Sequence, residues 1–290
     1  MFTFELLWNA LVAGVLLGGF YAAVSLGLSI TFGQLDIVNI SHPAFVILGA
    51  YIAYMGNEWW GFDPILTGVA AAPFFYLIGV GTYRFYYEAF ERRDDEALRG
   101  LAFFFGVMFI VEVVLIMVYG VDFRSVQAPY IGGNWEIGMI GIPTRMFVPC
   151  MVSLVMFAAV YLYLARTFTG RAILAVSQDR LALELMAADP VRVKQVGFGL
   201  GIATAAIAGA LLIIIIPIEP SVGRLYIGQV FAIVVLGGLG SITGTLVAAL
   251  ILGVAESLVS TFYGPSWAPA VAFSVLLLAL AVRPQGLFGR

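Results

Sequence analysis

Long runs of apolar residues follow one another along the chain, and most of them contain no interior Lys or Arg. An α-helix rises about 1.5 Å per residue, so it needs roughly 20 apolar residues to cross about 30 Å of hydrocarbon. Segments that meet this demand cleanly are 6–33, 64–83, 100–120, 146–165 and 195–217. Less regular apolar stretches that meet it loosely are 36–56, 225–262 and 267–282. Because 225–262 is too long for one crossing, the pattern predicts eight or nine transmembrane helices.

The composition agrees with a membrane protein. Hydrophobic residues make up 62% of the chain and charged residues only 11%, whereas soluble domains carry about 25% charged residues. The apolar runs are continuous, and therefore differ from the alternating strands of a membrane β-barrel. We expect an all-α polytopic membrane protein, with some helices broken or re-entrant, that forms a single transmembrane domain over residues 1–290. A soluble enzyme and a nucleic-acid-binding protein are excluded, the latter because the net charge is −3.

Cationic residues indicate the orientation of the chain. Eleven of the 14 Lys and Arg residues fall in 84–99, in 166–194 and in the tail after residue 282. Cytoplasmic loops are enriched in Lys and Arg, so a nine-crossing arrangement has the N-terminus outside and the C-terminus in the cytoplasm. The other three, Arg124, Arg145 and Arg224, then fall on the external side. The first residues lack the basic region and cleavage site of a signal peptide, which predicts a retained first helix.

The sequence offers little for catalysis. His42 is the only histidine and Cys150 the only cysteine, and neither H-E-x-x-H nor G-x-S-x-G occurs. A metal site of His and Cys ligands is therefore excluded, and we expect no enzyme activity. A Walker A loop is absent too, because the only lysine, Lys194, lies between Val193 and Gln195. We therefore expect the chain itself to bind no cofactor. If ATP hydrolysis powers its function, another polypeptide has to bind and hydrolyse the ATP.

The longest polar stretch between two spans is 167–194, and the charge bias places it in the cytoplasm. Its Ala, Leu and Glu content favours a surface helix within 171–188, after Gly170 ends the preceding helix and before Asp189-Pro190 stops the new one. Ser177, Arg180 and Glu184 would share one stripe of this helix. One interpretation is an ordinary solvated loop, and the other is a coupling helix that docks on a cytoplasmic partner. The polar side chains expected in such docking are Arg171, Gln178, Asp179, Arg180 and Glu184.

Four segments, in order, resemble one known family. They are GLSITFGQLDIVNISHPAFVILGAY at 27–51, GRAILAVSQDRLALELMAADPVRVK at 170–194, VVLGGLGSITGTLVAALILGVAESL at 234–258 and LAVRPQGLFG at 280–289. Together they are similar to the permeases of branched-chain amino-acid ABC transporters. One departure is Pro43, where many members of the family have Gly.

The resemblance implies an importer of the bacterial inner membrane. Two permeases, either two copies or this chain with a related partner, would pair with two ATPase subunits that bind ATP. An extracytoplasmic solute-binding protein would deliver the solute. Branched-chain amino acids are the expected solutes, although related permeases carry other amino acids, urea or short amides.

Two carboxylates and two interrupted spans are the polar features at membrane depth. Glu112 and Glu256 either pair across helices or line a path, because a charged group in hydrocarbon is costly. The apolar pattern is interrupted at 36–43 and again at 237–244, once in each half, as in transporters that expose backbone groups to a solute. Both could instead be plain loops between complete helices. An ion-coupled secondary transporter would use the same device, and it is the alternative function.

The first interruption predicts a path for the solute. Pro43 suits the first position of a helix, which predicts His42 as the cap and a helix from Pro43 to about Met55. Thirteen residues cover roughly 20 Å, so this helix would begin inside the membrane and present unpaired N–H groups to a solute carboxylate. The residues expected along the path are Asn39, Ser41, His42, Pro43, Glu112, Gly238, Gly240 and Ser241. His42 could instead cap a helix at the cytoplasmic surface. No Lys or Arg is expected near mid-membrane, which favours neutral or zwitterionic solutes.

Overall fold

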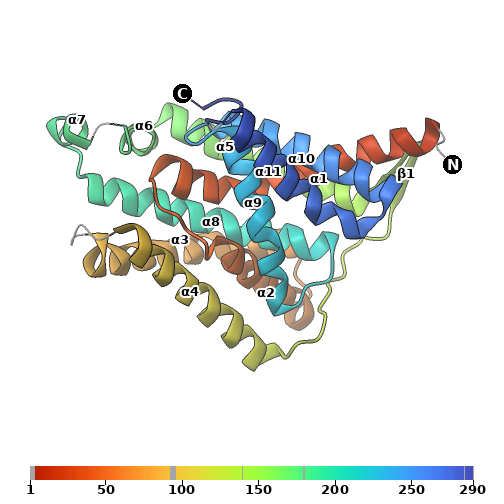
Figure 1. Ribbon diagram of the computed structural model, residues 1–290. Helices are drawn as coiled ribbons and strands as arrows, with labels where there is room; N and C mark the ends of the chain where they lie inside the picture. The colour runs from red at the N-terminus through yellow and green to blue at the C-terminus, as the bar shows by residue number, and fades with distance from the viewer. Residues whose placement is uncertain (1–3, 92–95, 139, 179, 284, 290) are drawn as a thin grey trace.

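The structure, a computed structural model, describes residues 4–91, 96–138, 140–178, 180–283 and 285–289. Nearly all of this part of the chain is helical (Figure 1). The long helices are α1 (Phe4–Leu28, continued by a π-helix, Ser29–Gln34), α2 (His42–Trp60), α3 (Pro64–Ala89), α4 (Glu96–Tyr119), α5 (Thr144–Arg166), α8 (Pro190–Ile215), α9 (Gly223–Gly237), α10 (Ile242–Tyr263) and α11 (Ala268–Val282). The short elements are α6 (Phe168–Ala175), α7 (Arg180–Leu185), two 3-10 turns (Pro220–Val222 and Pro265–Trp267) and the antiparallel hairpin of β1 (Asn134–Ile137) and β2 (Ile140–Pro143).

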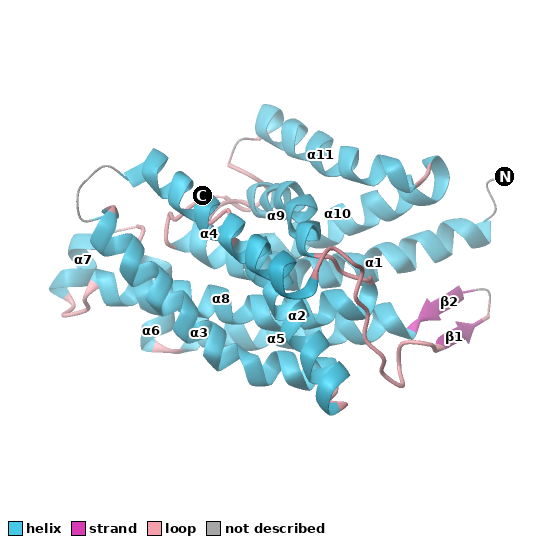
Figure 2. Cartoon of the chain, turned by 90° about the horizontal axis from the view of Figure 1, so that it is seen from below, coloured by secondary structure: helices cyan, strands magenta, loops and turns pink. Residues whose placement is uncertain are grey.

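The long helices run between two ends of the molecule. One end holds the N-terminus and the β1–β2 hairpin, and the other holds α6 and α7 (Figures 1 and 2). We call them the hairpin end and the α6–α7 end. Eight stretches of the described residues are long and apolar enough to cross a membrane, and they include every long helix except α2. The prediction of an all-α polytopic membrane protein is therefore confirmed.

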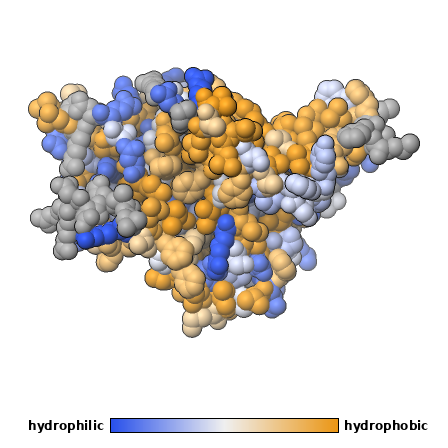
Figure 3. All heavy atoms as spheres, in the orientation of Figure 1, coloured by the Kyte–Doolittle hydropathy of each residue, from blue (hydrophilic) through white to orange (hydrophobic). Residues whose placement is uncertain are grey.

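Burial separates the helices into a centre and a periphery. In the most apolar stretch of α8, 83% of the residues are buried, and α1 with its π-helix reaches 72%. The corresponding stretch of α11 is only 6% buried. Apolar side chains that cover one face of the surface (Figure 3) therefore face hydrocarbon rather than water. The centre of this fold consists of α1 and α8, with α2 packed against α8.

Close contact between α2 and α8 depends on small residues. A Cβ atom added to Gly209 of α8 would lie 2.0 Å from the carbonyl oxygen of Val46 in α2. Reciprocally, a Cβ added to Gly49 of α2 would lie 2.8 Å from Cα of Ala206 in α8. Such backbone approach is the packing that small residues permit between membrane helices.

The structure corrects the expected limits of α2. Ser41 is the N-cap and His42 belongs to the first turn, so His42 is not the cap. The helix continues past Met55 to Trp60 and ends at Gly61, whose φ of 67° is left-handed. Its 19 residues span roughly 28 Å rather than 20 Å. The apolar pattern stops at Met55 because the last turn contains polar and aromatic side chains, although the backbone remains helical.

The segment 167–194 also differs from expectation. It forms two short helices, α6 and α7, instead of one helix within 171–188, so Ser177 does not share a helical stripe with Arg180 and Glu184. Gly170 does not end α5 but lies inside α6, and its amide donates to Thr167 Oγ1 at 2.9 Å. Asp189 and Pro190 begin α8, as N-cap and first helical residue.

The interruption within 225–262 is a short turn. Residues 238–241 join α9 to α10 at the α6–α7 end. A longer departure from helix lies earlier, at 216–222, between α8 and α9. The prolines Pro217 and Pro220 in this stretch cannot donate the backbone hydrogen bond that a continuing helix needs.

We expect Gly209→Ala to lower the stability of the permease by disturbing the contact between α2 and α8. The added methyl group meets backbone, so the helices have to separate at a cost of about 1–3 kcal/mol, the range typical of overpacking. Thermal unfolding in detergent measures this as a lower midpoint. Gly81→Ala in α3 is the matched control, because nothing lies within 4 Å of its added Cβ. Equal midpoints for the two variants would contradict the packing account.

Candidate functional site

A cavity of about 850 Å³ opens at the α6–α7 end. All four sequence segments that resemble the permease family contribute to its wall. Its lining residues are Gly33, Gln34, Asp36, Tyr161, Leu164, Ala165, Leu174, Ser177, Gln178, Leu239, Gly240, Ser241, Ile242, Thr243 and Phe288. Segments that are up to 250 residues apart in sequence therefore meet at one place, which we call the α6–α7 cavity.

The π-helix that continues α1 forms one wall of the α6–α7 cavity. Gln34 Nε2 donates to the carbonyl oxygen of Gly240 at 2.6 Å, and the hydroxyls of Ser29 and Thr245 are 2.8 Å apart. The turn between α9 and α10 is thus held against the end of α1. Gln34 lies two residues before the first interruption at 36–43, and Gly240 lies within the second, at 237–244.

The adjoining wall combines this turn with the C-terminal tail. Gly238 and Gly240 have φ values of 98° and 86°, which favour glycine. The amides of Leu287 and Phe288 donate to the carbonyl oxygens of Leu236 and Gly237, at 2.8 and 3.2 Å, and so complete the end of α9. Ser241 caps α10 by accepting a hydrogen bond from the Gly244 amide at 3.1 Å. These bonds explain why a glycine-rich turn and the tail sequence lie together.

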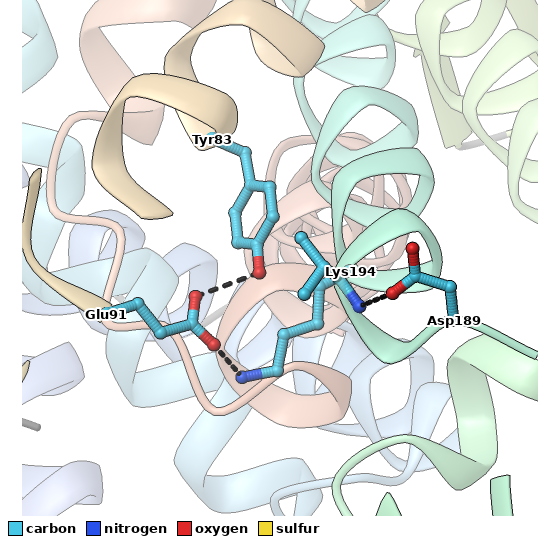
Figure 4. Close-up of polar contacts among 5 residues, drawn as sticks. Tyr83, Glu91, Asp189 and Lys194 are labelled. Atoms are coloured by element: carbon cyan, nitrogen blue, oxygen red, sulfur yellow. Dashed lines mark hydrogen bonds and ion pairs between the residues drawn. The ribbon is translucent and has the colours of Figure 1, made fainter. Parts of the chain in front are cut away.

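Charged groups lie close to the α6–α7 cavity. Partial burial raises the pKa of the Asp36 carboxyl above its ordinary value, and the positive charge of Lys194 opposes this shift. Lys194 Nζ donates to Glu91 Oε1 at 2.6 Å, and Tyr83 Oη donates to Glu91 Oε2 at 2.8 Å (Figure 4). The contact ties the end of α3 to the first turns of α8. Asp189 caps α8 through its bond to the Val191 amide, at 2.9 Å.

The predicted path residues at the start of α2 lie inside the bundle. After Gln34 the chain turns back along α1, and the Ile37 amide donates to the Thr31 carbonyl at 2.9 Å. His42 Nε2 is 3.0 Å from the Val24 carbonyl oxygen. Val24 precedes Gln34 by ten residues, so α2 begins roughly 15 Å inward from the end of the π-helix.

Asn39, Ser41 and His42 are completely buried, and Pro43 is buried as well. Asn39 Oδ1 accepts from the Ser41 amide at 3.1 Å and from the Ser41 hydroxyl at 2.6 Å. Asn39 Nδ2 and His42 Nδ1 have no hydrogen-bond partner within the described residues. Such buried polar atoms are uncommon and call for an explanation. In this conformation the group is closed to solvent.

The start of α9 faces the start of α2. A Cβ atom added to Gly223 would lie 3.2 Å from the Pro43 carbonyl oxygen and 3.0 Å from Ile47 Cγ1. The chain that precedes α9 is anchored by Ile218, which exchanges two backbone hydrogen bonds with Arg124. The helices α2 and α9 therefore begin beside each other inside the bundle. The chain enters α2 from the α6–α7 end and enters α9 from the hairpin end. The start of α2 thus faces the start of α9, whereas the Gly238–Gly240 turn lies at the other end of α9.

Glu112 forms an ion pair and does not line the α6–α7 cavity. It is buried in α4, and Arg224 Nε donates to its Oε2 at 2.8 Å while Arg224 Nη2 bonds its Oε1. Arg224 lies near the start of the candidate span Pro220–Gly237. The absence of Lys and Arg near mid-membrane stays a prediction. The Arg224 guanidinium, whose side chain is 53% exposed, offsets the cost of burying the Glu112 carboxylate.

Comparison with known proteins decides the family. The family described as "Branched-chain amino acid transport system / permease component" matches residues 10–280. The chain belongs to this family. LivH of Salmonella typhimurium is 29% identical, over 96% of this chain and 94% of its own length. BraD of Pseudomonas aeruginosa is 29% identical over 97% and 95%, and LivM of Escherichia coli is 25% identical over 92% and 67%.

A solved structure supports the fold alone. PsaBC from Streptococcus pneumoniae in complex with Fab has a TM-score of 0.50 and 13% identity, over 98% of this chain and 94% of that chain. The chain is a multi-pass membrane permease, a transport subunit and not an enzyme, as the sequence predicts.

Three of the predicted coupling residues are described with their side chains, and all three are exposed. Arg171, Gln178 and Glu184 are exposed, and Gln178 also lines the α6–α7 cavity. Asp179 lies outside the described residues, and for Arg180 only the backbone is described, at the start of α7.

The sequence interpretation missed a group of exposed apolar side chains in the same segment. Phe168, Leu181, Leu185 and Met186 are between 64% and 80% exposed. The signal was present, because these residues interrupt the polar pattern of 167–194.

If Ser41 lies on the solute path, its accessibility should change during transport. We expect Ser41→Cys, in a Cys150→Ala background, to react slowly with a maleimide at rest, because the position is completely buried, and faster during turnover. Ser241→Cys is the matched control, since it lines the α6–α7 cavity and should react in both states. Equally fast, nucleotide-independent labelling of both positions would remove Ser41 from the path.

Proposed function

We propose that the permease is one of two membrane subunits of an ATP-driven importer for branched-chain amino acids. Its family and the printed names of LivH and BraD support this proposal. The convergence of four family-like segments at the α6–α7 cavity, next to an exposed segment, is the structural observation that carries it. The chain has no Walker A loop, so the nucleotide has to be bound by partner subunits.

We assign the α6–α7 end to the cytoplasm of a bacterial cell and the hairpin end to the outside of the inner membrane. The support is the positive charge of the loops: Arg84, Arg99, Arg166, Arg171, Arg192 and Lys194 belong to the α6–α7 end. In this orientation the N-terminus is outside, and the tail beside α9 is cytoplasmic. The bilayer surrounds the peripheral helices.

The proposed partners bind at different ends of the permease. Two cytoplasmic ATPase subunits, one for each permease, would contact 167–194 through Leu181, Leu185 and Met186 together with the polar coupling residues. A second permease, identical or related as LivM is related to this chain, would complete the membrane part. An external solute-binding protein would deliver solute at the hairpin end.

Neutral or zwitterionic solutes remain the proposed cargo. Arg224 donates two hydrogen bonds to Glu112, so the pair carries no net charge, although guanidinium N–H donors remain for a solute carboxylate. A zwitterion brings its own ammonium group, whereas a strongly anionic solute would bring negative charge that no unpaired cation balances.

We expect leucine uptake by the assembled transporter to require ATP hydrolysis. Proteoliposomes that contain the permease, its partner permease and the ATPases should accumulate leucine when supplied with ATP and binding protein. Ionophores that collapse proton and sodium gradients should leave uptake unchanged. Uptake that stops with the ionophores and ignores ATP would favour the alternative, an ion-coupled secondary transporter, over the proposed function.

We expect Leu185→Glu to weaken ATPase docking, because it places a charge on an apolar residue that is 80% exposed at the end of α7. The loss of an apolar contact in an interface costs about 1–3 kcal/mol, so co-purification of the ATPase should fall roughly tenfold. Val121→Glu is the matched control: it is 66% exposed, but lies at the hairpin end. Normal docking by the Leu185 variant would refute the assigned surface.

A further inference from the structure

A second cavity, of about 680 Å³, opens at the hairpin end. We call it the hairpin-end cavity. It lies between α1, α9, α10 and α11, and most of its wall is apolar, with contributions from Leu17, Met146, Ile216 and Phe273. Glu256 and Arg224 are the two charged residues in this wall. An apolar pocket with a few polar groups is the usual form of a small-molecule site.

Glu256 is held in place by its neighbours. Its side chain is buried, with 2% of the residue exposed. Tyr21 of α1 donates to Oε2 at 2.5 Å, and Gln229 of α9 donates to Oε1 at 3.2 Å. Tyr21 and Gln229 line the cavity as well. A carboxylate has about four acceptor positions, so these two bonds leave capacity for an ammonium group.

None of the ion pairs in the described part of the chain includes Glu256. A buried carboxylate is normally paired, bound to a metal or neutralised, because its isolated burial is expensive. Glu112 satisfies this rule through Arg224, whereas the partners of Glu256 are uncharged donors. This difference between the two membrane carboxylates points to a cation that is absent from the chain itself.

Arg224 supplies the complementary charge. Glu112 occupies its Nε and Nη2, but a guanidinium has five N–H donors, and the side chain is 53% exposed. Donors therefore remain for a second carboxylate. Arg224 and Gln229 of α9 both line this cavity, and most of the remaining wall is apolar.

We propose that the hairpin-end cavity binds an α-amino acid with an aliphatic side chain, whose ammonium group binds Glu256 and whose carboxylate binds Arg224. The proposal rests on the proposed function and names the residues that receive the solute. Tyr21 and Gln229 orient the Glu256 carboxylate, and the apolar wall accepts the side chain. The solute would first contact the permease here, before it passes the buried start of α2.

Protection of a cysteine from labelling tests the proposal. Ser260→Cys lines the hairpin-end cavity and is placed, with Cys150→Ala, in the assembled transporter in membrane vesicles. An impermeant maleimide reports the labelling rate in the presence of L-leucine or 4-methylpentanoate, which has the same carboxylate and branched chain but no ammonium. We expect leucine to protect at a concentration about tenfold lower, as for the loss of one hydrogen bond to a charged group.

Glu256→Gln should abolish this preference, so that the two compounds protect equally, and should lower leucine uptake. The amide oxygen still accepts from Tyr21, and an unchanged unfolding midpoint shows that the fold is intact. Glu219→Gln is the matched control, because Glu219 is absent from the wall of the cavity, and it should retain the preference. A preference that survives Glu256→Gln, or no protection by leucine, overturns the inference.

The parallel uptake assay separates the two proposals. ATP-driven leucine uptake by the parent transporter, without any leucine protection at residue 260, refutes the cavity and leaves the proposed function standing. Absence of leucine uptake refutes the proposed function and the inference that rests on it.

Discussion

Backbone polar groups that leave a helix inside a membrane have to be satisfied by protein, because hydrocarbon offers no partner. Within the described residues, the segments 35–41 and 216–222 leave regular helix and meet this requirement. The first segment bonds back to the π-helix through Ile37 and Thr31, and the second pairs with Arg124 through Ile218. Both segments need surrounding protein, which is supplied by α1, α8 and the helices packed on them. The buried centre of the fold follows from this requirement.

Ion pairs connect peripheral helices to this centre. Glu112 joins α4 to α9, and Glu91 joins the end of α3 to α8 through Lys194. Each pair brings a buried carboxylate against a cation that keeps some exposure to the surroundings. Such pairs therefore do more to fix the positions of helices than to add net stability.

The sequence predicts those parts of the fold that depend on local pattern. Apolar runs locate α3, α5 and α8, and the gap between 195–217 and 225–262 locates the break before α9. Asp189-Pro190 begins α8 instead of stopping a surface helix, and the end of α2 is missed because its last turn contains polar and aromatic side chains. The Glu112–Arg224 pair joins residues 112 positions apart, which no local pattern encodes. The resemblance identified the four segments that meet at the α6–α7 cavity, but their convergence is a tertiary property.

The two cavities share a pair of helices although they open at opposite ends. Leu239 and Thr243 flank the turn of the α9–α10 hairpin in the α6–α7 cavity, while Gln229 and Glu256 of the same helices line the hairpin-end cavity. Between them, Ala22 to Leu28 of α1 and the start of α2 are buried, which closes the route in this conformation. Polar side chains, Ser29 with Thr245 and Tyr21 with Glu256, join α1 to α10 at both levels. If the α9–α10 hairpin moves against α1, these contacts break and both cavities change together. In the proposed transporter, an ATPase docked at the α6–α7 end would act in this way on a solute held near Glu256, because the turn that lines one cavity joins the helices that line the other.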